Sequence, residues 1–210
     1  MTVSFSKGSG ANYTMVRYKT GGYPTGPTDG TQAYWGTGTG GSVSSLTPGV
    51  LYYFRAYSYK SASAEYNTSE YSQQTAYTLP APPTSFVFTE VTTESLSVSW
   101  TKGAGADNTL VRYKLGSYPT NTSDGTQAYN SSGTSVDISS LDPGTLYYFR
   151  AWSYKTASSE YNTSEYLSDT ETTQTTPTGW TGKIGGISST NIGKIGGISI
   201  TDIGKIGGIE

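Results

Sequence analysis

The feature that most restricts the fold of this chain is an internal repeat. Residues 3–78 align without a gap to residues 98–173 at a constant shift of 95 residues, and 48 of the 76 aligned positions are identical. Self-similarity over units of this size is typical of a tandem duplication of small domains. The 210 residues therefore contain two copies of one fold, followed by a different C-terminal segment.

Several short runs of the second copy alternate apolar and polar residues. Alternation with a period of two predicts strands, each with one buried face. Gly- and Pro-containing stretches separate the runs, and short strands at this spacing are typical of a β-sandwich. In the last run we expect Tyr147, Phe149 and Ala151 to face inward. The predicted strands are 96–100, 110–114, 135–139 and 146–154.

The composition argues against catalysis and against several classes of ligand. The chain has no histidine and no cysteine, so imidazole bases, thiolate nucleophiles, disulfides and the usual zinc sites are excluded. Charged residues are 13% of the chain and the net charge is −2, so no surface for nucleic acid is expected. No apolar run is long enough to span a membrane, and the first residues do not resemble a signal peptide. We predict a protein that is not an enzyme and needs no cofactor or metal.

Changes in composition divide the chain into four parts. Prolines cluster in Leu79–Pro83, and such segments favour stiff, extended structure. Beyond the second copy, a unit that begins Gly-Lys-Ile-Gly-Gly-Ile recurs every 11 residues. We predict a first domain over 1–78, a Pro-rich linker over 79–83, a second domain over 84–176 and a repeat tail over 177–210.

A set of spaced residues in the second copy points to a fold family. The set consists of Pro83 ahead of a strand that ends near Val91, Leu96-x-Val98-x-Trp100, Val111-x-Tyr113, and Leu141-x-Pro143-Gly144-Thr145-x-Tyr147-x-Phe149-Arg150. With these residues the second copy resembles a fibronectin type III domain. The resemblance implies an all-β fold, with two tandem immunoglobulin-like β-sandwiches and a Gly/Ile-rich tail. It also implies that Trp100 packs at the core centre and that the Tyr147 hydroxyl bonds to backbone; Phe5 and Tyr52 match them in the first copy.

The first copy has nothing that matches the first strand of the second copy. Met1 and Thr2 align with Leu96 and Ser97, so residues 83–95 have no counterpart. Three explanations stay open: the chain is shortened or processed, the fold omits the strand, or another segment supplies it. In the third case a neighbouring subunit donates a strand to the unpaired edge. The candidate assembly residues are Val3 and Phe5 at that edge, and Ile198, Ile200 and Ile203 in the tail as a donor.

The tail itself is rich in glycine and isoleucine. A Gly-Gly pair in every unit and the β-branched residues argue against a helix, so we predict short strands or an extended repeat that packs on something else. It resembles the Lys-Ile-x-Gly-Ile/Val repeats at the ends of phage virion and microbial surface proteins. A flexible tail is the alternative.

The outward face of the larger sheet is the best candidate for a ligand. Alternation brings aromatic and basic side chains together there, and such side chains stack on sugars or form protein interfaces. The pattern fits equally with cross-strand pairs that only stabilise the sheet. The candidates are Arg17, Lys19, Tyr53, Arg55, Tyr57, Arg112, Lys114, Tyr148, Arg150 and Trp152.

From these features we expect a structural, non-catalytic subunit of an extracellular filament, a phage virion or a cell-surface assembly. It would be a homo-oligomer or filament that polymerises through strand-edge and tail contacts, with donor-strand exchange as one route. The alternative is an adhesion or carbohydrate-binding accessory module that uses the aromatic and arginine face. Neither hypothesis involves nucleic acid or a membrane span.

Overall fold

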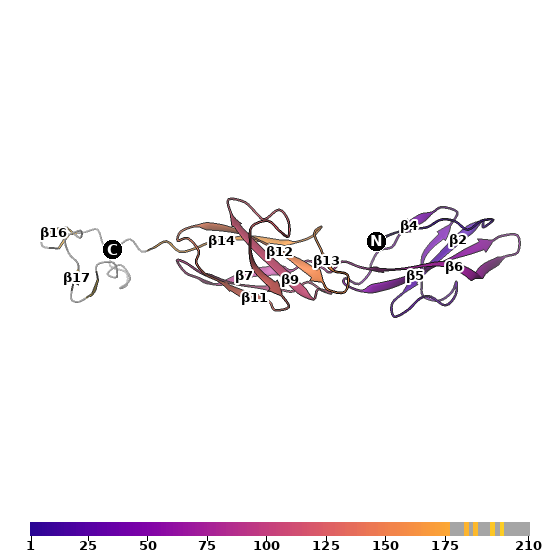
Figure 1. The fold of residues 1–210 in the computed structure, drawn as a ribbon, viewed down its shortest axis with the longest axis horizontal. Coiled ribbons are helices and arrows are strands. Elements are labelled where there is room, and N and C mark those ends of the chain that lie inside the picture. Colours follow the sequence, from indigo (N-terminus) through magenta and orange to yellow (C-terminus); the bar gives the residue numbers. More distant parts are fainter. Residues whose placement is uncertain (177–182, 185–186, 189–193, 196–197, 200–210) are drawn as a thin grey trace.

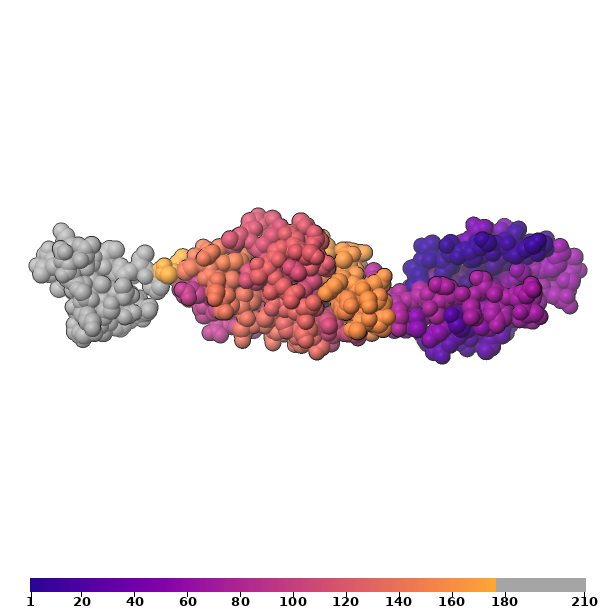
Figure 2. All heavy atoms as spheres, viewed as in Figure 1, coloured from indigo at the N-terminus to yellow at the C-terminus, as the bar shows by residue number. Residues whose placement is uncertain are grey.

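The computed structural model describes residues 1–176, 183–184, 187–188, 194–195 and 198–199. Across these residues the secondary structure consists of strands and contains no helix. The two copies form two sandwiches that lie end to end, joined by a narrow neck (Figures 1 and 2). The all-β prediction is confirmed.

The first sandwich is built from a two-stranded and a four-stranded sheet, all pairs antiparallel. The small sheet holds β1 (Thr2–Ser4) and β4 (Gly40–Ser42). The large sheet has the order β3-β2-β5-β6, with β2 (Tyr13–Lys19), β3 (Thr31–Gly36), β5 (Leu51–Lys60) and β6 (Glu65–Tyr77).

The second sandwich has a three-stranded sheet where the first has two strands. This sheet has the order β11-β8-β7, with β7 (Thr84–Val91), β8 (Leu96–Thr101) and β11 (Ser135–Ile138). In the facing sheet β12 (Leu146–Lys155) pairs with β9 (Asn108–Leu115), β13 (Glu160–Tyr161) and β14 (Leu167–Thr172), and β9 pairs with β10 (Thr126–Ser131). The four strands expected from alternation are therefore present.

In the tail the structure describes two short antiparallel pairs. β15 (Lys183–Ile184) pairs with β16 (Ile187–Ser188), and β17 (Lys194–Ile195) pairs with β18 (Ile198–Ser199). Of the predicted donor residues, Ile198 lies in β18, whereas Ile200 and Ile203 lie outside the described residues.

The core of the second sandwich forms between its two sheets, as alternation predicts. Tyr147, Phe149 and Ala151 of β12 are all buried. Trp100 is buried against Tyr129, with ring centroids 5.1 Å apart in an edge-to-face arrangement. Its place in the core agrees with the role that the resemblance implies.

Each sandwich contains the tyrosine corner that the resemblance implies. The backbone N–H of Thr47 donates to the Tyr52 hydroxyl oxygen at 3.0 Å, and that of Asp142 donates to the Tyr147 hydroxyl oxygen at 2.9 Å. Both tyrosines are buried. The same loop is therefore attached to the same strand in both copies.

Candidate functional site

The first candidate site is the outer edge of β1. Within residues 1–176, β1 pairs only with β4, whereas the equivalent β8 lies between β11 and β7. The Phe5 N–H donates to the Thr39 carbonyl at 2.9 Å, and the Met1 carbonyl accepts from Val43 at 2.8 Å. Along an antiparallel strand, the N–H and C=O groups of successive residues point to opposite sides. Met1 and Phe5 bond toward β4, so the N–H and C=O groups of Thr2 and Ser4 point to the open side.

A groove of about 250 Å³ lies beside this edge. Val3, Phe5 and Phe54 supply much of its apolar lining, and Ser72–Gln74 of β6 lie across from them. In the second sandwich the equivalent space holds the side chains of β7. The Phe88 ring packs on Phe149 with centroids 5.2 Å apart, and the Phe86 ring lies 6.4 Å from Trp100. Phe54 and Phe5 are the counterparts of Phe149 and Trp100.

The vacant groove changes the burial of equivalent residues. Val3 and Phe5 are half-buried on the surface of their core, whereas Val98 and Trp100 are buried. The structure therefore places both predicted edge residues at an apolar, one-sided strand edge. Such an edge is a template for pairing with another strand.

The second candidate site is the outward face of the larger sheet, where most of the predicted residues do come together. Arg17 lies opposite Arg55 in the strand register, and Arg112 lies opposite Arg150. The Arg55 guanidinium lies 3.9 Å from the centroid of the Tyr71 ring, and Arg150 lies 3.9 Å from that of Tyr166. Tyr53 and Tyr148 each meet a further ring edge-to-face at 5.1 Å, that of Tyr23 or Tyr118.

The positive charges of this face have partners within their own sandwich. Lys19 Nζ donates to Asp29 Oδ2 at 2.7 Å, and Lys114 Nζ donates to Asp124 Oδ2 at the same distance. Arg17 Nε donates to the carbonyl of Pro27 at 2.6 Å. Each of these cations already has an acceptor in its own sandwich. The contacts therefore fit the alternative in which the outward face only stabilises the sheet.

The two aspartates are held in the ionised form. The hydrogen bond from Lys19 is the largest cause that keeps the pKa of Asp29 well below its usual value, and the N–H and hydroxyl of Thr25 add to it. Lys114 and Thr120 do the same for the pKa of Asp124. The glycine that follows each aspartate has a positive φ, 77° at Gly30 and 79° at Gly125, so the Asp-Gly pairs mark turns.

The prediction that Tyr57 and Trp152 are available on the outward face is wrong. Each of these residues is only 1% exposed. The Tyr57 hydroxyl donates to the carbonyl of Pro24 at 3.0 Å, and Pro24 is itself fully buried. The loop between β2 and β3 therefore covers this end of the sheet. Trp152 packs edge-to-face on Tyr166, with centroids 6.3 Å apart.

Residues outside the predicted set complete the face. Tyr23, Tyr71, Tyr118 and Tyr166 supply rings for the two stacked arginines. Their signal in the sequence is the exact repetition of Tyr-Pro-Thr and Glu-Tyr-Asn-Thr-Ser-Glu-Tyr in both copies. Strand alternation missed Tyr23, Tyr118 and Tyr166 because they lie outside strands, whereas Tyr71 lies within β6, beyond the runs in which alternation was found.

Neither a metal site nor a spanning helix is found where the structure is described. No group of three or more acidic, histidine or cysteine side chains there is arranged to hold a metal ion. Among the same residues no helix has the length and apolar character to cross a membrane.

Residues 81–170 match a family model described as the fibronectin type III domain. No curated protein sequence matches the chain. Among solved structures, a two-domain fibronectin type III segment from chicken tenascin is similar at 19% identity and a TM-score of 0.50, covering 82% of this chain and 91% of that one. The fn3 domain of human collagen alpha-1(XX) is similar at 24% identity and a TM-score of 0.38, covering 46% and 86%. The FN1–FN3 domains of chicken CNTN1 are similar at 18% identity and a TM-score of 0.38, covering 82% and 62%.

Proposed function

We propose that this chain is a structural, non-catalytic subunit of an extracellular assembly. Its two sandwiches have the fold of tandem fibronectin type III domains. This fold commonly serves as a structural or adhesion module, and its domains are commonly extracellular. The assembly would be a filament, a virion or a cell-surface layer. Subunits would join through the open edge of β1 and through the tail.

The observation that carries the proposal is the unpaired edge of β1 beside its apolar groove. Soluble proteins usually cover or charge such an edge, yet Thr2 and Ser4 are uncharged and Val3 and Phe5 line the groove. A strand from a neighbouring subunit would complete the sheet. Since that contact joins two different surfaces, it would be heterologous, and such contacts generate an open polymer where the rotation between subunits does not close a ring.

The test is the assembly state of the full chain over a range of concentrations. Sedimentation velocity and negative-stain electron microscopy should show polymers that grow with concentration. The Ser4→Pro variant should shorten or abolish them, because proline removes an N–H from the open edge. Ser4→Ala keeps that N–H and should assemble normally. A wild-type chain that stays monomeric at every concentration contradicts the proposal.

A second candidate function is adhesion through the aromatic and arginine face. It is favoured by the exposure of Tyr71 and Tyr166, which are 45% and 44% exposed although the ring of each stacks on an arginine. A glycan array would compare the wild-type chain with Tyr166→Ala. Loss of a bound glycan in the variant supports adhesion, and no glycan bound by the wild type removes carbohydrate as the ligand.

A further inference from the structure

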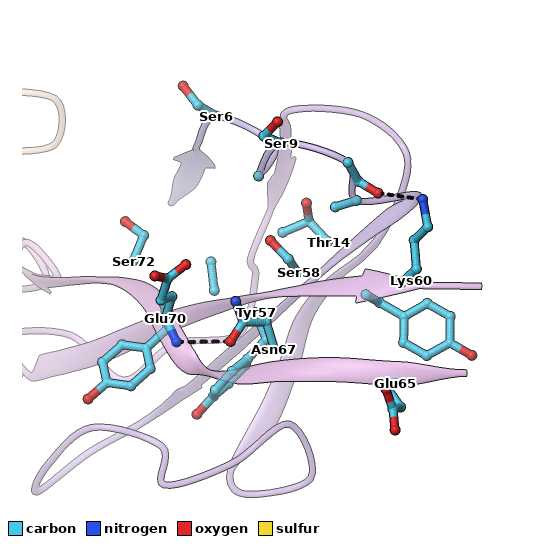
Figure 3. Close-up of a pocket in the computed structure, with 16 residues that line it drawn as sticks. Ser6, Ser9, Thr14, Tyr57, Ser58, Lys60, Glu65, Asn67, Glu70 and Ser72 are labelled. Carbon is cyan, nitrogen blue, oxygen red and sulfur yellow. Dashed lines mark hydrogen bonds between the residues drawn. The ribbon is translucent and has the colours of Figure 1, made fainter. Parts of the chain in front are cut away.

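A second hollow on the first sandwich adjoins the groove at the β1 edge. Its volume is about 580 Å³, and it lies between the loop that follows β1 and the β5–β6 hairpin (Figure 3). Ala56 and Ser72 line both hollows, so the two adjoin each other. Together they form one long depression along the side of the first sandwich.

In the second sandwich the linker occupies the counterpart of this hollow. Pro80 and Pro83 are fully buried there. The Asn162 side-chain amide donates to the Pro80 carbonyl at 2.9 Å, and the Ala81 N–H donates to the Ala104 carbonyl at 2.9 Å. The linker is therefore packed into the sandwich, and the chain continues from it into β7.

Glycine makes room for that linker. A Cβ added at Gly103 would overlap the Ala81 carbonyl oxygen, so only glycine allows the linker to lie this close. The first copy has the same residue type at the equivalent position, Gly8, which lines the hollow.

The hydrogen-bonding groups for a linker are also retained in the first sandwich. Ser9 and Asn67 stand where the second has Ala104 and Asn162. Asn67 Oδ1 accepts from the N–H of Glu70 at 3.0 Å (Figure 3), and Asn162 Oδ1 makes the equivalent contact with Glu165 at 3.2 Å. The difference is burial, since Asn162 is 4% exposed and Asn67 is an exposed residue.

We infer that the two hollows form a single acceptor site for one extended polypeptide segment from outside residues 1–210. The segment has prolines that enter the larger hollow, followed by a strand with aromatic residues at alternate positions that fills the groove. Residues 79–91, Leu-Pro-Ala-Pro-Pro-Thr-Ser-Phe-Val-Phe-Thr-Glu-Val, show this chemistry on the equivalent surface of the second sandwich. The inference rests on the proposed function, because it specifies the strand that the open edge receives.

The chemistry of this site favours such a partner over the tail of a second copy. The repeat units over 182–210 have neither proline nor an aromatic residue, and Pro177 and Trp180 stand before them in the tail, whereas the occupied counterpart has its prolines and rings within residues 79–91. Two partly buried phenylalanines that pack on the core contribute more apolar area than the isolated isoleucines of a Gly-rich repeat. The tail remains the competing occupant in the experiment below.

The experiment titrates a dye-labelled peptide of residues 79–91 into the full chain below the concentration at which it assembles. We expect saturable binding with one peptide per chain. Hydrogen exchange should become slower in residues 1–10 and 65–76, which line the depression, and stay unchanged in the second sandwich, whose counterpart is already filled.

Three matched changes locate the binding. A peptide with Phe86→Ser and Phe88→Ser should bind at least about 100-fold more weakly, since both rings that pack on the core are lost. A full chain with Asn67→Asp keeps the oxygen acceptor but loses the amide donor, and should bind the wild-type peptide about tenfold more weakly. Asn121→Asp changes an exposed asparagine that accepts from Ser123 at 2.8 Å, and should leave the affinity unaltered.

The outcomes separate this inference from the proposed function. Three results would overturn the inference. They are no saturable binding, an affinity that does not change when the two phenylalanines are replaced, and equal protection from hydrogen exchange by a peptide of residues 194–206. Polymers that form unhindered in excess 79–91 peptide would also overturn it while leaving the structural role intact. A chain that binds the peptide at the depression but never assembles supports the inference and contradicts the proposed function.

Discussion

The two sandwiches share 48 of 76 aligned residues, yet they differ along one side. In the second, residues 79–91 fill that side, and Val98 and Trp100 beneath them are buried. In the first, no described segment lies there, and Val3 and Phe5 are only half-buried. The burial of a core residue thus depends on a neighbouring segment as well as on its own strand.

The same comparison shows how context changes an identical sequence. Glu-Tyr-Asn-Thr-Ser-Glu-Tyr is part of the continuous strand β6 in the first sandwich. In the second it spans the end of β13 and the break before β14, around Asn162. Asn162 donates to the Pro80 carbonyl there, so the break lies where the linker contacts the second sandwich.

The largest expected effect is on the two cores. Phe149→Ala should lower the free energy of unfolding of the second sandwich by about 3–5 kcal/mol, because a fully enclosed ring is removed. Phe54→Ala should cost the first sandwich less, about 2–3 kcal/mol, because that ring, although buried, lines the groove and packs against fewer side chains there. Urea titration followed by hydrogen exchange resolves the two sandwiches. Equal losses would show that the open side does not weaken the first core.

The next effect concerns the linker contact. Asn162→Asp should destabilise the second sandwich by about 1–3 kcal/mol, because a buried donor becomes an acceptor that faces the Pro80 carbonyl. The same change at Asn67 should cost less than about 0.5 kcal/mol, since that residue is exposed. Thermal unfolding of the two variants measures the difference, and a large loss in Asn67→Asp would mean that the chain itself already fills the hollow.

The tyrosine corners should not distinguish the two sandwiches. Tyr52→Phe and Tyr147→Phe each remove one acceptor from a backbone N–H, so each should cost its own sandwich about 1 kcal/mol. Denaturant unfolding of both variants provides the comparison. A loss confined to one variant would mean that the corners differ in strength despite their matching geometry.

The smallest effect is a dependence on pH that both sandwiches share. The lowered pKa values of Asp29 and Asp124 mean that the ionised carboxylates stabilise the folded state above the unfolded pKa of about 4. That contribution is lost as the pH falls from there towards the folded pKa. Asp29→Asn and Asp124→Asn should each flatten the acid side of the stability profile of its own sandwich, measured by unfolding between pH 2 and 6. An unchanged profile would show that these ion pairs contribute nothing measurable.

Strand alternation predicted the β-sandwich class and the inward side of β12, because a period of two is visible in the sequence itself. Both tyrosine corners were instead implied by the resemblance that one set of spaced residues carries. The burial of Tyr57 and Trp152 was not predictable in this way, because it depends on a loop folding back over the sheet. A count of prolines likewise indicated an extended linker over 79–83 but not the surface that it contacts.

The candidate sites were predictable to different degrees. The edge of β1 followed from an alignment that lacks one strand, and the structure adds the adjoining hollow that only the occupied copy explains. On the outward face, alternation identified most of the basic residues but gave no information on the acceptors that hold them, such as Asp29 and Pro27.

The buried linker also determines how the molecule responds to force. The Thr78 N–H donates to Val50 at 3.0 Å on the first sandwich, and the Leu79 carbonyl accepts from Gly49 at 3.2 Å. From Pro80 onward the chain is held by the second sandwich. Leu79 and Pro80 are adjacent and each is hydrogen-bonded to a different sandwich, so we expect the joint to have little freedom to bend. We expect a pull on the two ends to strain these hydrogen bonds at the joint first.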